Sequence, residues 1–170
     1  MKRRDLADLL FAFGEERKSR RIAQFIVAAR ADHPIVTTLE LARLIERAIG
    51  RKPGDAHPAT RSFQALRIAV NAEFDELVEG LFAAERLLGE GGRLAVVTFH
   101  SLEDRIVKQH FRSWSARCVC PPELPICQCG GKARAVRLTP GAARPTAEEI
   151  ARNPRARSAR LRALEWVDER

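Results

Sequence analysis

The sequence predicts an α/β fold, and three observations around residues 94–99 carry that prediction. These residues form a short, nearly unbroken apolar run after a glycine turn, which is typical of a strand buried on both faces. A helical pattern over residues 73–88 precedes the run, and another helix starts within residues 100–105. Helix, glycine turn, buried strand and helix is the order of open parallel sheets, which bind ligands outside the carboxyl ends of their strands. We therefore expect a functional site at residues 100–105.

In the first part of the chain, residues 1–72, the sequence pattern predicts helices and no strand. Apolar side chains recur at helical spacing over residues 5–13 and 22–29. Thr37 with Glu40 three residues later predicts a capping box that begins a third helix. The apolar faces of these first helices are small, so we expect them to be marginal as a core and to pack on something else.

The second part, residues 73–170, contains the strand described above and two further predicted strands. Ser101 with Asp104 predicts a capping box that begins the helix after the first strand. Apolar residues that alternate with arginine predict strands within residues 133–139 and 158–166. We expect these two strands to pair antiparallel.

The composition of the chain indicates an anionic partner. Of the 170 residues, 30 are Lys or Arg and 22 are Asp or Glu, which gives a net charge of +8. The pI is near 10.1. This balance favours nucleic acid as the partner, and the alternative is a solvated basic surface. No apolar run approaches the length of a membrane span and the first residues lack a signal-peptide core, so we expect a soluble, cytoplasmic protein with no membrane partner.

Three segments, residues 57–71, 91–108 and 153–158, occur in the same order as motifs of a known family. With Gly-Gly-Arg-Leu at 91–94 and Phe-His-Ser-Leu-Glu-Asp-Arg-Ile-Val-Lys at 99–108, the chain resembles the ribosomal RNA small subunit methyltransferase H family over essentially its whole length. The resemblance implies S-adenosylmethionine-dependent methylation of cytosine N4 in 16S rRNA. It also implies a Rossmann-like class I methyltransferase fold, with the small ribosomal subunit as partner.

The resemblance covers only the latter part of the family's sequence. The family's glycine-rich cofactor loop and its Asp-Leu-Gly catalytic segment lie upstream of the matching region. We therefore expect residues 73–170 to form the C-terminal part of the methyltransferase sheet, and residues 1–72 to be a helical insertion that recognises RNA. We also expect no cofactor-binding residue in this chain and no activity of the chain alone. The alternative is a non-catalytic RNA-binding or ribosome-associated remnant.

His100 and Ser101 are the candidate residues of the catalytic pocket. The residues alone explain Ser101 as well by a helix cap as by a function in the pocket. His100, in contrast, stands where a parallel strand delivers side chains to a ligand. The resemblance implies that both line the site for the target cytosine. A Ser-His-Asp hydrolase is excluded, because adjacent residues point in different directions and the Gly-x-Ser-x-Gly elbow is absent.

Basic and amide side chains in all three motifs are candidates for contacts with RNA. Arginine is always charged and binds phosphate oxygens in pairs, so an arginine-rich stretch over residues 152–162 suits phosphate binding. For the candidates within residues 57–71, the alternative is a solvated helix face. For those within residues 153–158, the alternative is a basic turn and a protected sheet edge. The RNA-binding candidates are Arg61, Arg67, Asn71, Arg105, Asn153, Arg155, Arg157 and Ser158.

All four cysteines lie in a loop over residues 118–131 that is rich in proline and glycine. They form two Cys-x-Cys units, Cys118 with Cys120 and Cys127 with Cys129. Four thiolates suit a closed, structural zinc site, although the usual spacing within a pair is two residues. The alternative is four reduced surface thiols. Zinc would favour a third functional class, a zinc-ribbon-like module for protein interaction.

Overall fold

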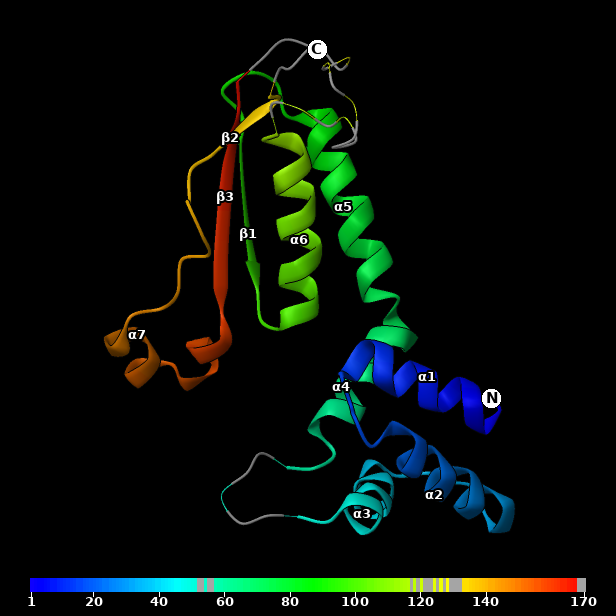
Figure 1. Cartoon of the computed structure of the whole chain (residues 1–170). Helices are drawn as coiled ribbons and strands as arrows, with labels where there is room; N and C mark the ends of the chain where they lie inside the picture. The colour runs from blue at the N-terminus through cyan, green and yellow to red at the C-terminus, as the bar shows by residue number, and fades with distance from the viewer. Residues whose placement is uncertain are drawn as a thin grey trace. The chain divides into compact units, whose positions relative to one another are not determined.

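The computed structural model describes most of the chain (Figure 1). The described residues are 1–51, 54, 57–116, 118, 120, 124, 126, 128 and 133–167. The chain divides into two compact units, Met1–Glu73 and Phe74–Arg170. Helices occur in both units and the described strands only in the second, so the chain has the mixed α/β composition that the sequence predicts. None of the helices in this part of the chain is long and apolar enough to cross a membrane.

The described part of the first unit is a group of four helices that share one core. They are α1 (Arg3–Gly14), α2 (Ser19–Asp32), α3 (Thr38–Ile49) and α4 (Thr60–Asn71). Their buried side chains form a single cluster that includes Leu10, Ile22 and Ile45, each fully buried. The first three helices share this core with α4, which adds its own apolar face to theirs.

Close contact between α1 and α4 depends on Gly14, the last residue of α1. A Cβ atom at this position would lie 2.5 Å from the carbonyl oxygen of Arg61 on α4. Any side chain would therefore push the two helices apart.

Only half of the predicted capping box at the start of α3 is present. The hydroxyl of Thr37 accepts a hydrogen bond from the backbone N–H of Glu40 at 3.2 Å. The Glu40 carboxylate accepts from the backbone N–H of Val36 at 3.1 Å and lies 2.8 Å from Nε2 of His33. The hydrogen bond with His33 is the main cause that lowers the pKa of Glu40.

Among its described residues, the second unit contains a three-stranded sheet and the helices beside it. Its elements are α5 (Glu73–Leu87), which begins at the last residue of the first unit, β1 (Arg93–Thr98), α6 (Ser101–Trp114), β2 (Ala135–Arg137), α7 (Ala147–Arg152), a 3-10 helix η1 (Pro154–Ser158) and β3 (Arg160–Trp166). The strand order is β1-β3-β2, and both pairs are antiparallel. The predicted antiparallel pairing of the last two strands is confirmed.

One face of this sheet packs on α6, with α5 beside it (Figure 1). The core of the unit centres on Trp114 of α6, whose ring lies 5.3 Å from that of Trp166 on β3. Val107 and Leu164 are fully buried in the same cluster. The long apolar stripe of α6 therefore holds the helix flat against the sheet.

The expectation that residues 94–99 are buried on both faces is wrong for the described part of the chain. Side chains of β1 alternate, with Leu94 and Val96 turned to the core, and Ala95 and Val97 exposed. Among the described residues β1 pairs only with β3, and antiparallel, so the predicted parallel arrangement is not found here. An apolar run shows that a strand has two apolar faces, but it does not show what covers each of them.

Candidate functional site

A pocket of about 330 Å³ lies where β1 ends and α6 begins, against the segment that leads from η1 into β3. We call it the β1-end pocket. It is lined by Phe99, His100, Ser101, Arg144, Arg157, Ser158, Ala159 and Arg160. Three of these residues are arginines and none is acidic, so the pocket suits an anionic group.

The pocket brings together candidates from two sequence motifs that are far apart in the chain. His100 and Ser101 meet Arg157 and Ser158 in its wall. The antiparallel pairing of β1 with β3 explains this meeting, because Thr98 at the end of β1 is opposite Arg160 at the start of β3. The sequence identifies both motifs, and only the strand pairing joins them.

Three polar or aromatic residues of the pocket were not among the sequence candidates. Phe99 was expected to be buried in a strand, but its side chain is 55% exposed. Arg144 reaches the pocket because Ala143 forms an isolated bridge with Leu161 of β3. Arg160 belongs to the basic stretch that the sequence singles out, but no local signal separates it from its neighbours.

The first turn of α6 is capped one residue earlier than predicted. The N-cap is His100, whose Nδ1 accepts from the backbone N–H of Glu103 at 3.4 Å. The Glu103 carboxylate in return accepts from the backbone N–H groups of Phe99 at 2.9 Å and His100 at 3.3 Å. The predicted Ser101–Asp104 box is wrong because Ser101 is already helical. An imidazole nitrogen replaces the oxygen of the usual cap residues, so a search for those residues misses it.

This capping box fixes the ring of His100 in the wall of the pocket. Because Nδ1 accepts a hydrogen bond, the neutral ring carries its proton on Nε2. Nε2 lies 3.0 Å from Oε1 of Glu103. Burial raises the pKa of Glu103, but its hydrogen bonds with the His100 side chain and the Phe99 backbone outweigh burial and lower it.

Asp104 is buried beneath the pocket and anchors two arginines of β3. Arg162 donates to both carboxylate oxygens, from Nε at 2.7 Å and from Nη2 at 3.0 Å, and Arg160 donates from Nη1 at 2.9 Å. These bonds, with Arg162 first, lower the pKa of Asp104 against the opposing effect of burial. Arg160 is thereby held at the pocket wall, whereas Arg162 is tied into the structure and is not available to a phosphate.

The remaining candidates of the last two motifs lie on the surface. Arg105 is exposed on α6, and Arg155 is exposed on η1. Asn153 has a local structural function, because its side-chain oxygen accepts from the backbone N–H of Arg155 at 3.2 Å and begins η1.

In the helical unit, two of the three RNA candidates share an acidic partner. Arg67 forms two hydrogen bonds with the Glu73 carboxylate, at 2.7 and 2.9 Å, and Asn71 donates to it at 3.3 Å. Arg61 donates to the backbone oxygen of Glu15 at 3.4 Å. An RNA phosphate would have to replace the carboxylate at Arg67, so Arg61 is the more accessible cation of α4.

Comparison with known proteins identifies the family of the chain. A profile of the MraW methylase family matches residues 1–167. The chain belongs to this family. The ribosomal RNA small subunit methyltransferase H of Thermomicrobium roseum is 57% identical over 163 residues, which cover 96% of this chain and 50% of the relative. The proteins of the same name from Syntrophotalea carbinolica and Treponema denticola are 55% and 51% identical, over 94% and 98% of this chain and 52% and 54% of their own lengths.

The resemblance drawn from the three motifs is thus confirmed at the level of the family. The chain spans about half the length of the curated relatives it matches.

The family implies S-adenosylmethionine as the cofactor, and the backbone at neither end of β1 fits a cradle for it. The glycine turn before β1 lies at the end of the sheet opposite the β1-end pocket, where Gly91 donates to the carbonyl of Trp166 at 2.8 Å. At the other end of β1, side chains of the capping box already bind the backbone N–H groups of Phe99, His100 and Glu103. No step of the reaction is therefore assigned to a cofactor held by these residues.

Two of the four predicted zinc ligands lie outside the described residues. Cys127 and Cys129 are not described. Cys118 is exposed, and the half-buried Cys120 accepts at Sγ from the backbone N–H of Gln128 at 3.3 Å. Zinc binding stays a prediction, which the metal content of protein purified without chelator would test.

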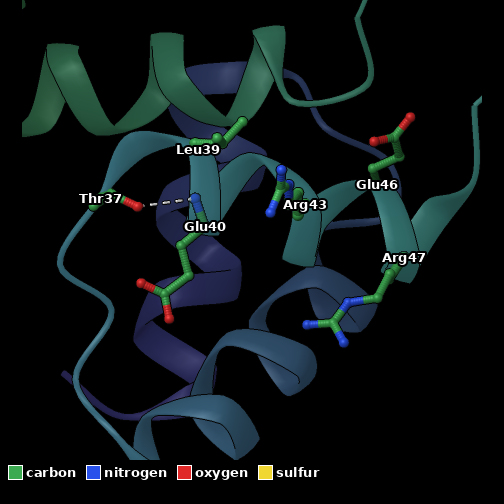
Figure 2. Close-up of a pocket in the computed structure, with 6 residues that line it drawn as sticks. All are labelled: Thr37, Leu39, Glu40, Arg43, Glu46 and Arg47. Carbon is green, nitrogen blue, oxygen red and sulfur yellow. Dashed lines mark hydrogen bonds between the residues drawn. The ribbon is translucent and has the colours of Figure 1, made fainter.

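A second pocket, of about 690 Å³, lies along α3 in the helical unit (Figure 2). Its lining residues are Thr37, Leu39, Glu40, Arg43, Glu46 and Arg47. The two arginines are matched by two glutamates, so this pocket has little net charge and does not favour an anion.

Proposed function

We propose that this chain is the RNA-facing part of an enzyme that methylates N4 of a cytosine in 16S rRNA with S-adenosylmethionine, on the small ribosomal subunit in the cytoplasm. The β1-end pocket carries the proposal, since two family motifs form one cationic pocket there. The names of the relatives, which state methylation of small-subunit rRNA, support it. In this proposal residues 73–170 belong to a Rossmann-like class I sheet, and residues 1–72 are a helical insertion that contacts RNA.

The lining of the pocket suits one nucleotide that has left a base-paired helix. Cytosine N4 is engaged in pairing inside a duplex, so its methylation needs a flipped or single-stranded base. The exposed ring of Phe99 offers a stacking surface for such a base. Arg144 and Arg157 would bind the flanking phosphates, which position the RNA without reading its sequence.

His100 and Ser101 would form the wall that faces the base. The capping box holds the His100 ring and the backbone of Phe99 rigidly, so the stacking surface and the polar wall keep a fixed spacing. S-adenosylmethionine would supply the methyl group, and the residues of this chain would bind and orient the cytosine. Arg61, Arg67, Asn71, Arg105, Asn153, Arg155 and Ser158 are the further proposed RNA contacts.

The test is a fusion of this chain with the half of the Thermomicrobium roseum relative that it does not match. The fusion is incubated with labelled S-adenosylmethionine and small ribosomal subunits, and the digested rRNA is analysed for N4-methylcytidine. We expect methylation, and we expect Phe99→Ala or Arg157→Gln to lower kcat/KM about tenfold or more. Phe82→Ala, which removes an exposed ring on α5 outside the pocket, is the matched control.

Two results would overturn the proposal. Methylation that is unaffected by both pocket variants would show that the pocket is not the RNA site. Salt-dependent rRNA binding that both variants weaken, without any methylation by the fusion, would favour the non-catalytic RNA-binding protein instead.

A further inference from the structure

A groove of about 780 Å³ runs between α1 and α2 in the helical unit, and none of the sequence candidates lies in it. It is lined by Arg3, Arg4, Ala7, Asp8, Arg20, Arg21 and Gln24. We propose that this groove is a second RNA-binding site, which holds a stretch of sugar-phosphate backbone. The inference rests on the proposed function, which has residues 1–72 contact RNA, and it assigns that contact to a groove that uses no residue of the β1-end pocket.

The arginines stand in two pairs at separate points along the groove. The helices α1 and α2 run antiparallel, as the hydrogen bond from Arg30 near the end of α2 to the carbonyl of Met1 requires. Arg3 and Arg4 lie in the first turn of α1, and the other pair lies in the first turn of α2, near the end of α1. At 1.5 Å per residue, about two helical turns, or roughly 11 Å, separate the pairs.

The spacing favours a polymer with repeated phosphates over a single anion. Each pair can bind a phosphate of its own, so the groove suits an anion with several phosphates along its length. A nucleic-acid strand carries one phosphate per nucleotide, so nearby phosphates of the same strand can contact the two pairs. Between the pairs, Ala7 leaves room for the backbone, and the amide of Gln24 offers donors and an acceptor for sugar hydroxyls.

The arginines of the groove are accessible, and little acid opposes them. All four are exposed. The one acidic residue, Asp8, lies 3.8 Å from Arg4 in an exposed pair, which a phosphate would readily displace. The guanidinium of Arg21 lies over the ring of Phe25 at 5.9 Å, which limits its movement.

The lining also favours nucleic acid over an acidic protein segment. Protein partners are usually held by buried apolar or aromatic anchors, and the only apolar residue in the lining is Ala7. Nucleic acid needs no such anchor, because phosphate contacts supply most of its non-specific affinity.

The experiment measures binding of the full chain to a fluorescein-labelled single-stranded RNA of 12 nucleotides, by anisotropy, from 50 to 300 mM KCl. The double variant R20Q/R21Q should weaken binding about tenfold at the lowest salt, and it should reduce the slope of log Kobs against log[K⁺] by about 1.4. R3Q/R4Q should act similarly. The matched control is R43Q/R47Q, which removes two exposed arginines from the charge-balanced α3 pocket and should leave the slope nearly unchanged.

The outcomes separate this inference from the proposed function. An unchanged slope in R20Q/R21Q, or an equal loss in R43Q/R47Q, would overturn the groove as a site. Competition by a poly-glutamate 12-mer as strong as that by unlabelled RNA would overturn its assignment to nucleic acid. Arg157→Gln reports on the β1-end pocket alone, so its effect would persist if the groove were wrong. If both sites bind RNA, the two effects on free energy should add.

Discussion

The two units of this chain close their cores to different degrees. In the helical unit, the apolar stripes of four helices converge on one buried cluster. In the sheet unit, α5 and α6 cover one face of the sheet, whereas Val97 and Val136 on the other face are 53% and 50% exposed. A helix has one apolar stripe and therefore one face to bury, but a strand with apolar residues on both sides needs two layers to cover it.

The two units also use arginine differently. In the sheet unit, buried Asp104 binds Arg162 with two hydrogen bonds and so removes it from the surface. In the helical unit, the arginines of the α1–α2 groove have only Asp8 among them. The number of arginines in a segment therefore does not give the number of phosphate contacts, because the acidic residues that pack nearby decide which cations remain accessible.

The largest effect should separate the two cores. Trp114→Ala removes a buried ring that contacts Trp166 and Phe111, and it should lower the free energy of unfolding of the sheet unit by about 4 kcal/mol. Leu10→Ala should cost the helical unit about 3 kcal/mol. Hydrogen exchange measured on peptides from α6 and from α2 would locate each loss, since the two buried clusters share no residue.

The control for the core variants is Phe11→Ala, which removes an exposed ring beside Leu10 and should change stability by less than about 1 kcal/mol. Faster exchange across both units in Trp114→Ala would contradict the division into two cores.

A smaller loss of stability should follow when Asp104, which binds two arginines, is substituted. Asp104→Asn leaves Arg162 and Arg160 without their carboxylate, and it should lower the stability of the sheet unit by about 3 kcal/mol, because a partner of a buried charge pair is lost. Asp75→Asn, at an exposed position of α5, is the control and should stay within about 0.5 kcal/mol. Equal urea midpoints for the two variants would show that the buried pair contributes nothing.

Acid should weaken the sheet unit through the same carboxylate. Because the pKa of Asp104 is lowered in the folded state, its stabilising contribution is complete above its unfolded pKa of about 3.9, and it is lost as pH falls through the lower folded value. The lowered pKa of Glu103 acts in the same direction. Urea midpoints measured between pH 7 and 2.5 should fall more steeply for the wild type than for Asp104→Asn. Parallel curves would argue against a lowered pKa.

The smallest effect concerns a cap in the helical unit. Thr37→Ala removes the side-chain acceptor for the N–H of Glu40 and should cost about 1 kcal/mol, whereas Thr37→Ser keeps the hydroxyl and should cost less. Thermal unfolding of the helical unit, followed by circular dichroism, would compare them. Equal losses in both variants would assign the effect to the methyl group of Thr37 and not to the cap.

The sequence by itself determined the local elements and the family. The helices of residues 1–72, the cap at Thr37 and the last two strands depend on neighbours within a few residues, so their pattern is readable in the chain. The family was also readable, because its motifs keep their residues and their order.

Only the tertiary structure decided which side chains are covered and which distant residues meet. The burial of Asp104 under Arg162 and the exposure of Phe99 depend on groups that are distant in the chain or on which face a neighbour covers. Residues 99–101 and 157–160 form one pocket because β1 and β3 pair antiparallel. The periodicity of the sequence shows which face of an element is apolar. Which residues cover that face, or place charges beside it, is decided only when the chain packs.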